Sequence, residues 1–310
     1  MKKATIITLT LLFLLANTVI YNHAYQFTHF DPNATQRTGK PEQLTLPQKL
    51  KTLFNGITIP RPTHTSQPTQ PFKTIYLQSH EKIEGWLIEN PNSKGTIIQF
   101  HGYSSKKSGI LNYSDEFQKL GYNTFLIDFM GSGGSTGNAT TIGYKESKDV
   151  RVAYDYIKEN YPNQKIILHG PSMGAVAIMK SIHDYDIKPD QIIIECPFGS
   201  MRKTTQARFE AMNLPTFILP DWLLLYGGLQ NGFNPYKHVP TNYAKKITIP
   251  TLLITGAKDA RVSRQEIDDI YTNLKGQKTL KILKNAQHEN YLHRYKKEWL
   301  TFVTPFLSLQ

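Results

Sequence analysis

Residues 165–174, KIILHGPSMG, lead an apolar β-rich run directly into a serine flanked by glycines. Gly170, Ser172 and Gly174 form the pattern G-x-S-x-G between a predicted strand at 165–168 and a predicted helix at 173–184. This context is typical of a nucleophile elbow, a sharp turn that raises the serine hydroxyl above the edge of a sheet. Ser172 would also lie at a helix amino terminus, where free N–H groups favour negative charge. We therefore predict that Ser172 is a nucleophile.

The chain around this motif alternates between strand-like and helix-like segments from residue 72 onward. A hairpin at 72–77 and 82–88 precedes predicted strands at 95–100, 123–127, 165–168, 191–194, 251–255 and 280–283. Helices are predicted at 110–120, 143–160, 173–184, 263–274 and 291–306. This alternation indicates an α/β fold with a mostly parallel central sheet and helices on both faces. Active sites of such sheets lie at the carboxyl ends of the strands.

Two later strand ends carry the partners that a serine nucleophile needs. The run 251–255 leads into Asp259, and the run 280–283 leads into His288. Nucleophile, acid and histidine thus follow one another in the order found with a nucleophile elbow. We predict that neutral His288 takes the proton of Ser172 and returns it to the leaving group. Asp259 would fix the tautomer of His288 and stabilise the imidazolium.

The loop after the strand at 95–100 supplies candidate donors for an oxyanion hole. It begins with His101, Gly102 and Tyr103, and we predict that the backbone N–H of Tyr103 and that of Met173 point at the developing oxyanion. For His101 we favour a structural role, as a hydrogen-bonding side chain within the loop, over a catalytic one.

Other polar residues compete with these assignments. Glu195 ends the strand at 191–194 and is an alternative acid, whereas His293 falls inside the last predicted helix. The glycine-rich loop at 128–135 has neither the lysine of a P-loop nor a G-x-G-x-x-G that opens a helix, so we interpret it as a structural turn. Cys196 is the only cysteine and is assigned no chemistry. We predict no metal and no cofactor.

Residues 197–249 separate two predicted strands by more than one crossover helix requires. A structureless loop of that length is uncommon in a compact domain, so we predict a small helical cap inserted after the sixth strand. Its segment 217–226 is strongly apolar. Two interpretations remain open: the segment lines an acyl pocket, or it forms the core of the cap itself.

The amino-terminal segment predicts export or anchoring. Lys2 and Lys3 precede an apolar run at about 6–20, so residues 1–30 are interpreted as a signal peptide or a signal anchor, with a buried first helix of the domain as the alternative. The two lysines favour a cytoplasmic amino terminus, which would place the remaining chain, periplasmic or extracellular, outside the cytoplasm. Whether the segment is cleaved stays open.

Residues 31–71 are proline-rich and are predicted to be a linker, followed by the catalytic domain at 72–310 with its cap at about 197–249. Inside the linker, 45–56 predicts one short helix, with Thr45 as N-cap and Gly56 at its end. Leu46, Leu50 and Leu53, together with Phe54, would share one face. Docking of this face on the body is preferred over contact with a membrane.

The composition is that of an ordinary globular protein. The 310 residues contain 39% hydrophobic and 19% charged residues and have a formal net charge of +12. Because the basic residues are spread along the chain rather than gathered in an arm, nucleic acid is not predicted as a partner.

Taken together, HGYSS at 101–105, DFMGSGGS at 128–135, GPSMG at 170–174, GAKD at 256–259 and His288 resemble the α/β-hydrolase superfamily across nearly all of residues 72–307. Within it, the chain is most similar to the serine-aminopeptidase-like, monoacylglycerol-lipase-like and Bem46-like branches. The resemblance implies a metal-free, cofactor-free acyl-enzyme mechanism and a lid after the strand that precedes Cys196. The sequence departs from many relatives at Met130, where they carry Arg, and at Pro171, where they often carry His.

We expect a carboxylic-ester hydrolase, esterase-like or lipase-like, whose substrate is a small-molecule or lipid-like ester with an apolar acyl group. A serine peptidase is an alternative, for which Asp221 or Glu210 would have to bind a free amino terminus. An acyl-thioesterase and a catalytically inactive ligand-binding protein are further alternatives.

Overall fold

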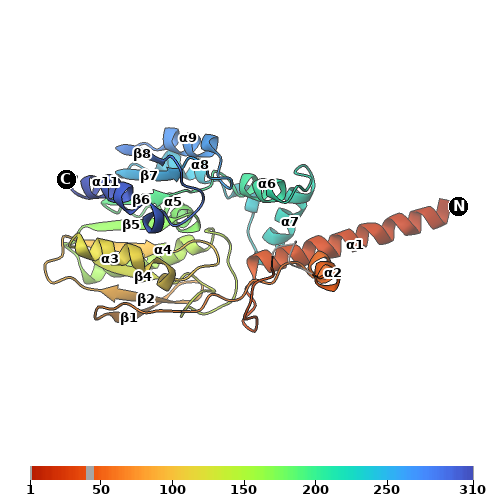
Figure 1. Ribbon diagram of the computed structural model, residues 1–310, viewed down its shortest axis with the longest axis horizontal. Helices are drawn as coiled ribbons and strands as arrows, with labels where there is room; N and C mark the ends of the chain where they lie inside the picture. Colours follow the sequence, from red (N-terminus) through yellow and green to blue (C-terminus); the bar gives the residue numbers. More distant parts are fainter. Residues whose placement is uncertain (1, 40–44, 310) are drawn as a thin grey trace.

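The computed structural model describes residues 2–39 and 45–309 (Figure 1). Three parts of the chain lie outside this range: residues 40–44 of the predicted linker, residue 1 of the predicted signal segment, and residue 310 of the predicted catalytic domain. The core is an eight-stranded sheet with the strand order β1-β2-β4-β3-β5-β6-β7-β8. The strands are β1 (Lys73–Gln78), β2 (Lys82–Ile88), β3 (Thr96–Phe100), β4 (Asn123–Ile127), β5 (Ile166–Pro171), β6 (Gln191–Glu195), β7 (Thr251–Gly256) and β8 (Lys278–Leu283).

The pairing confirms the predicted mostly parallel sheet. β1 pairs with β2 and β2 with β4 in antiparallel fashion, and all pairs from β4 to β8 are parallel. Neighbouring residues of the central strand β5 point to opposite faces, so Ile166 and Leu168 enter one apolar cluster while Ile167 enters the other. Both faces are therefore buried, as the near-continuous apolar strands predict.

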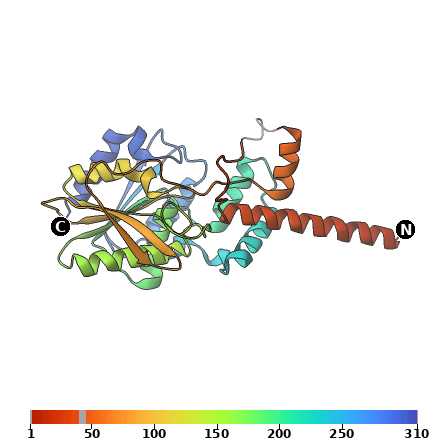
Figure 2. The same cartoon turned by 90° about the horizontal axis from the view of Figure 1, so that it is seen from below.

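Helices cover the two faces of the sheet, above and below it in Figure 2. One layer contains α4 (Glu146–Asn160), α5 (Met173–Tyr185) and α9 (Arg264–Asn273), and the other contains α3 (Leu111–Lys119), α10 (Tyr291–Arg294) and α11 (Lys296–Leu307). The predicted continuous helix at 291–306 is wrong at one point, because Tyr295 leaves the helical conformation with φ −125° and ψ 39°. The break separates the Asn290-capped turn of α10 from α11, whose Trp299 is fully buried.

The interval between β6 and β7 is helical, as predicted. It contains α6 (Met201–Ala211) and α7 (Leu219–Asn231), followed by short turns that include α8 (Pro240–Tyr243). We refer to α6 and α7 as the cap helices. Figure 1 shows them beside the sheet, on the side from which α1 (Lys2–Thr28) projects.

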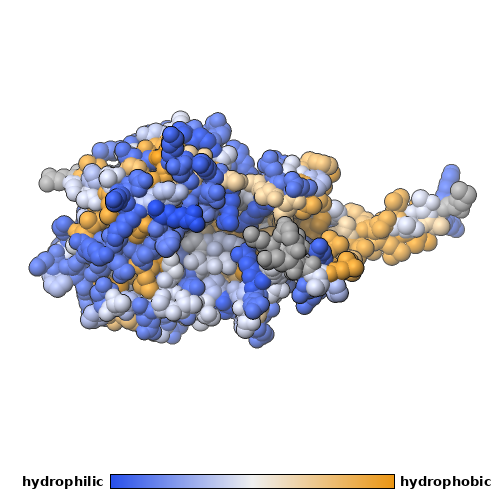
Figure 3. Space-filling view, viewed as in Figure 1, coloured by the Kyte–Doolittle hydropathy of each residue, from blue (hydrophilic) through white to orange (hydrophobic). Residues whose placement is uncertain are grey.

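The amino-terminal helix α1 is long and apolar enough to cross a membrane. From Phe13 toward the body it packs on α7: the rings of Phe13 and Trp222 stack with centroids 5.8 Å apart, and Tyr21 meets Tyr226 edge to face. Its outer half projects away from the body and is apolar on its surface (Figures 1 and 3). The alternative of a buried first helix is wrong, because the large apolar side chains between Ile6 and Leu15 are exposed.

Helix α2 (Leu46–Asn55) forms where the sequence predicts it, with Gln48 accepting the N–H of Thr45 and with Gly56 at its end. Asn22 and His23 of α1 bond to the last carbonyls of α2, which places the two helices side by side. The preferred docking of its apolar face on the body is wrong. The four side chains of that face remain between 42% and 70% exposed: Leu46, Leu50, Leu53 and Phe54.

Candidate active site

The carboxyl ends of β5, β7 and β8 bring the three predicted catalytic side chains together. The Nε2 atom of His288 lies 2.9 Å from Oγ of Ser172, and its Nδ1 atom lies 2.7 Å from Oδ2 of Asp259. Ser172 and His288 are 116 residues apart in the chain, and they meet because parallel strands end at the same edge of the sheet.

Ser172 occupies a strained turn between β5 and α5. Its backbone has φ 53° and ψ −114°, outside the regions that a residue with a side chain prefers. The flanking glycines make the turn possible: a Cβ on Gly170 would lie 2.6 Å from the carbonyl carbon of Gly174, and one on Gly174 would lie 2.3 Å from the carbonyl oxygen of Phe100. The backbone N–H of Ser172 donates to the carbonyl of Glu195 at 2.7 Å, which fixes the turn against β6.

Asp259 is held so that one carboxylate oxygen is free for the imidazole. Its Oδ1 atom accepts the backbone N–H groups of Arg261 and Val262, at 2.8 and 3.0 Å. The remaining oxygen, Oδ2, faces Nδ1 of His288. With the proton on Nδ1, Nε2 is an acceptor that can take the proton of Ser172.

The surroundings of His288 favour its protonated form. Burial opposes the imidazolium, but Cys196 and Asp259 outweigh burial, and together they raise the pKa of His288 above its ordinary value. The base therefore binds a proton more tightly than a free histidine does.

Cys196, to which the sequence assigns no chemistry, is buried beside Asp259 and His288. It directly follows β6, is 2% exposed, and has a φ of 40°. Its Sγ and the ligand atoms of Asp259 and His288 all lie within 4.8 Å of one another. Its position at a strand end, like those of Ser172 and Asp259, is the sequence signal that could have revealed it.

The predicted oxyanion donors lie beside the serine. Tyr103 and Met173 both line the pocket that contains Ser172, and within the described part of the chain no hydrogen bond engages the backbone N–H of either residue. The side chain of Tyr103 points toward α1, since its hydroxyl donates to the carbonyl of Phe27 at 2.6 Å. Both N–H groups are thus free for a ligand at the amino end of α5.

The predicted structural role of His101 is confirmed. This buried ring accepts the N–H of Phe129 at Nε2, 3.1 Å away, so Nδ1 carries the proton donated to the carbonyl of Gly102. Glu195, the alternative acid, is engaged elsewhere: its carboxylate accepts from the Tyr113 hydroxyl and the Trp299 indole at 2.8 and 2.7 Å. It does not contact His288.

The glycine-rich loop after β4 is a structural turn, as predicted. Asp128 at its start is fully buried and accepts the backbone N–H groups of Lys107 and Gly134, at 2.7 and 2.9 Å. Asp128, Glu84 and His64 have metal-ligand spacing. The ammonium group of Lys107, bonded to both carboxylates, already lies among them, so the cluster has a cation of its own.

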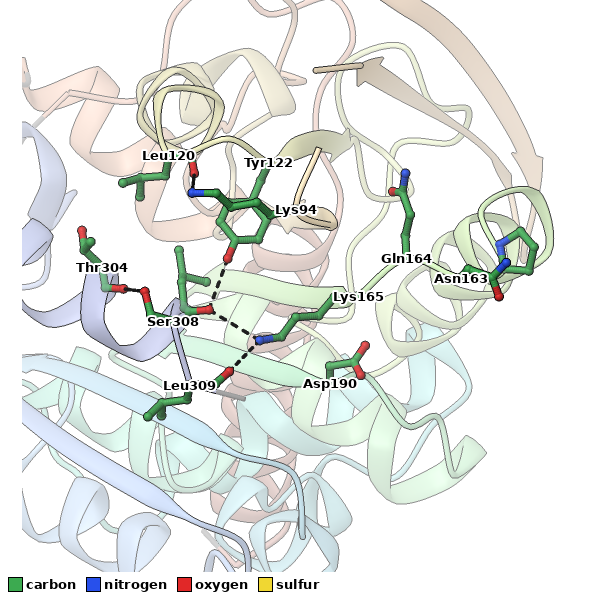
Figure 4. A pocket seen from close by; sticks show the side chains of 12 residues that line it. Lys94, Leu120, Tyr122, Asn163, Gln164, Lys165, Asp190, Thr304, Ser308 and Leu309 are labelled. Carbon is green, nitrogen blue, oxygen red and sulfur yellow. Dashed lines mark hydrogen bonds between the residues drawn. The ribbon is translucent and has the colours of Figure 1, made fainter. Parts of the chain in front are cut away.

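The pocket around Ser172 has a volume of about 220 Å³ and contains Tyr103, Cys196 and His288 in its lining. A larger surface depression of about 860 Å³ lies at the opposite, amino-terminal edge of the sheet (Figure 4). The two lysines of this depression donate hydrogen bonds to backbone carbonyls: Lys94 to that of Leu120, and Lys165 to that of Leu309. We therefore regard the smaller pocket, which contains Ser172 and His288, as the candidate active site.

The apolar cap segment 217–226 divides its side chains between three environments. Leu223 and Leu224 line a small apolar cavity together with Phe27 of α1. Trp222 and Tyr226 pack on α1, as described above. Phe217 and Ile218 are 70% and 61% exposed, so both interpretations, acyl pocket and core of the cap, are wrong for these two residues.

Known families match most of the chain. The family model described as serine aminopeptidase, S33, matches residues 91–235, and a model described as PhoPQ-activated pathogenicity-related protein matches residues 233–309. Together the two matches extend from the segment before β3 to the end of α11.

Individual proteins also match more than half of this chain. The chain is 28% identical to the protein YqkD of Bacillus subtilis, over 73% of this chain and 75% of that protein. It is 24% identical to the lysophosphatidylserine lipase ABHD12 of Macaca fascicularis, over 56% of this chain and 44% of the lipase. The solved structure of the Pyrococcus furiosus esterase Pf2001 matches with a TM-score of 0.65 and 27% identity, over 80% of this chain and 97% of the esterase.

Proposed function

The chain is a member of the α/β-hydrolase superfamily, and from this premise we propose that it is a serine hydrolase that cleaves carboxylic esters through an acyl-enzyme intermediate. The observation that carries the proposal is the pair of hydrogen bonds from His288, one to Ser172 and one to Asp259. Family membership alone leaves the reaction open, because this fold supports many reactions.

In the proposed mechanism, His288 removes the proton of Ser172 as its Oγ attacks the ester carbonyl. The tetrahedral oxyanion is stabilised by the backbone N–H groups of Tyr103 and Met173, each a donor worth about 3 to 4 kcal/mol in comparable sites. His288 then gives its proton to the leaving alcohol, and an acyl-Ser172 ester remains. Water, activated by the same imidazole, hydrolyses that ester and releases the acid.

An apolar acyl group fits the surroundings of the pocket. The small cavity lined by Phe27, Leu223 and Leu224 adjoins the pocket of Ser172, and Ile142 lines both. The similarity to the esterase Pf2001 and to the lysophosphatidylserine lipase ABHD12 supports an ester as the substrate. The peptidase alternative is weaker, since Asp221 is paired with Arg202 and neither Asp221 nor Glu210 lines the pocket.

We further propose that α1 remains attached as a membrane anchor and that the body lies outside the cytoplasm. The carboxyl end of α1 is built into the body: Ala24, Phe27 and Thr28 line the apolar cavity, and the carbonyl of Phe27 accepts the hydroxyl of Tyr103. Cleavage after this helix would remove one wall of that cavity.

A panel of p-nitrophenyl esters with acyl chains of two to twelve carbons tests the proposed reaction. We expect the full chain in detergent to hydrolyse members of the panel, and Ser172→Ala to lower kcat/KM at least about a thousand-fold. Asp259→Asn should lose about four orders of magnitude, because an amide favours the wrong tautomer of His288.

Ser181→Ala on α5 is the matched control, since the Ser181 hydroxyl is buried and has no hydrogen-bond partner in the described chain. It should hydrolyse the panel as the unmodified protein does. Undiminished turnover by Ser172→Ala, or cleavage of aminoacyl-p-nitroanilides without any ester hydrolysis, would contradict the proposal.

A further inference from the structure

Two arginines line the pocket of the candidate nucleophile without a partner. Arg208 on α6 and Arg261 after β7 share the lining with Ser172. Glu289 is the only carboxylate among the residues that line this pocket, and it is paired with Arg294 at 3.0 Å. Within the described part of the chain, neither pocket arginine forms a side-chain hydrogen bond or an ion pair. The pocket therefore has an excess of positive charge.

Arg208 is held in place by rings rather than by acceptors. Its guanidinium carbon lies 5.2 Å from the ring centre of Tyr103 and 5.6 Å from that of Phe27, so two aromatic rings flank the group. Such contacts position the guanidinium but leave its five N–H donors unsatisfied. Burial lowers the pKa of Arg208. The neighbouring Tyr103 raises this pKa, whereas the positive charges of Arg261 and Arg37 lower it further. A half-buried cation in these surroundings is stabilised by an anion that supplies acceptors.

Five of the other six arginines of the described chain have oxygen partners. They pair with a carboxylate or, in one case, with backbone carbonyls: Arg151 with Asp155, Arg202 with Asp221, Arg264 with Asp268, Arg294 with Glu289, and Arg61 with Gly133, Ser135 and Gly137. The three without a partner in the described range are Arg37, Arg208 and Arg261, and these three are neighbours. Among the arginines of the described chain, missing partners are thus confined to Arg208 and its neighbours Arg37 and Arg261.

Arg208 also marks the border between the polar and the apolar part of the site. It lines the pocket of Ser172 and, with Ile142, the apolar cavity between α1 and the cap helices. A ligand that extends from Ser172 toward Arg208 thus meets a cation beside an apolar wall. This arrangement suits an amphiphile that carries both an acyl chain and a negative group.

We propose that Arg208, with Arg261 beside it, binds a phosphate or carboxylate group of the substrate, so that Ser172 acts on anionic acyl esters in preference to neutral ones. The inference rests on the proposed ester hydrolysis and names its substrate class. Planar guanidinium groups bind both anions through paired N–H donors, so phosphate and carboxylate share the recognition chemistry.

Three esters with the same acyl group test the proposal: 1-butanoylglycerol, its 3-phosphate, and 3-butanoylglycerate. Release of butyrate is followed for the full chain in detergent. We expect kcat/KM for one or both anionic esters to exceed that for the neutral ester by about 10- to 100-fold, the range of a hydrogen-bonded charge pair. Whether the phosphate or the carboxylate gains more identifies the source of the anion.

In Arg208→Gln the ratio of anionic to neutral kcat/KM should fall to about one. Arg264→Gln is the matched control, because it removes the same charge from an exposed residue of α9 that is paired with Asp268. It should keep the ratio of the unmodified protein. If Arg208→Gln does not fold, Arg208→Lys, which keeps the charge but loses the paired donors, should retain only part of the preference.

Equal kcat/KM for all three esters in the unmodified protein would overturn the inference and leave ester hydrolysis standing. A preference that survives in Arg208→Gln, or falls equally in Arg264→Gln, would also overturn it. Failure to hydrolyse any of the three esters, or p-nitrophenyl butyrate, would instead contradict the proposed function itself.

Discussion

At the scale of single residues, the imidazole of His288 has two neighbours that favour its charged form. Asp259 faces Nδ1 from the loop after β7, and Cys196 approaches from the end of β6. Burial alone would lower the pKa of His288, yet the two neighbours raise it. Only the neutral ring can accept the proton of Ser172, so this balance decides the pH at which the enzyme works.

The raised pKa of His288 predicts an alkaline shift of the acid limb of the pH–rate profile. Below the pKa the ring is protonated, and kcat/KM for p-nitrophenyl butyrate should fall about tenfold per pH unit. We expect the midpoint of this limb above 6.5, the ordinary histidine value. A midpoint at or below 6.5 would contradict this account.

The residues that sequence analysis could find are those that follow strands. Ser172, Asp259 and His288 each come shortly after a recognisable β-rich run, and parallel pairing alone brings such positions together. Arg208 could not be found in this way. It lies in the last turn of the cap helix α6, away from any strand end, and its significance depends on the absence of partners around it, which only the folded chain reveals.

At the scale of elements, the strand–turn–helix of β5 and α5 depends on close backbone contacts. A Cβ on Gly174 would lie 2.3 Å from the carbonyl oxygen of Phe100 at the end of β3, so the start of α5 leaves no room for a side chain against this strand. Any side chain there would push α5 away from the sheet and displace the backbone N–H of Met173.

Gly174→Ala should therefore lower the free energy of unfolding by about 1 to 3 kcal/mol, the usual cost of overpacking, and also reduce esterase activity. Gly227→Ala in α7 is the matched control. A Cβ there would meet nothing within 4 Å, so the change should raise stability by about 0.5 to 1 kcal/mol through helix propensity. Urea unfolding in detergent compares the two variants. Equal stability of the two would show that the turn tolerates a side chain.

The positions of helices and strands can be predicted from local sequence patterns. Which surface each helix packs against cannot. Thr45 and Gly56 suffice to predict the two ends of α2, since capping is local. The pattern of Leu46, Leu50, Leu53 and Phe54 predicts an apolar face but does not say what covers it. The break at Tyr295 was missed because the amphipathic pattern continues across it.

At the scale of the whole molecule, α1 and the cap helix α7 pack on each other at one end of the protein, where much of the surface of α1 is apolar (Figure 3). Phe13, about midway along α1, stacks on Trp222 of α7. If α1 lies in a bilayer, as we propose, then Trp222 must lie at or within its surface. The exposed Phe217, Ile218 and Leu229 of the cap point to the same orientation, in which the substrate pocket faces lipid.

Lipids with brominated acyl chains test this orientation, because bromine quenches tryptophan only at contact range. The other two tryptophans, Trp86 and Trp299, are buried in the body. We expect brominated vesicles to quench a large fraction of the fluorescence of the full chain, and Trp222→Phe to abolish that quenching. Quenching that persists in Trp222→Phe, or no quenching while the protein floats with the vesicles, would contradict a membrane-facing cap.

The attachment site of a fluorophosphonate probe is the most direct test of the central claim that His288 activates Ser172. Ser172 is the only serine in the tryptic peptide 166–180, so mass mapping of the labelled full chain assigns the modified residue directly. We expect the mass of the probe on this peptide, and no labelling in Ser172→Ala or His288→Ala. Modification of a different peptide, or ester hydrolysis by a protein whose peptide 166–180 stays unmodified, would contradict the account.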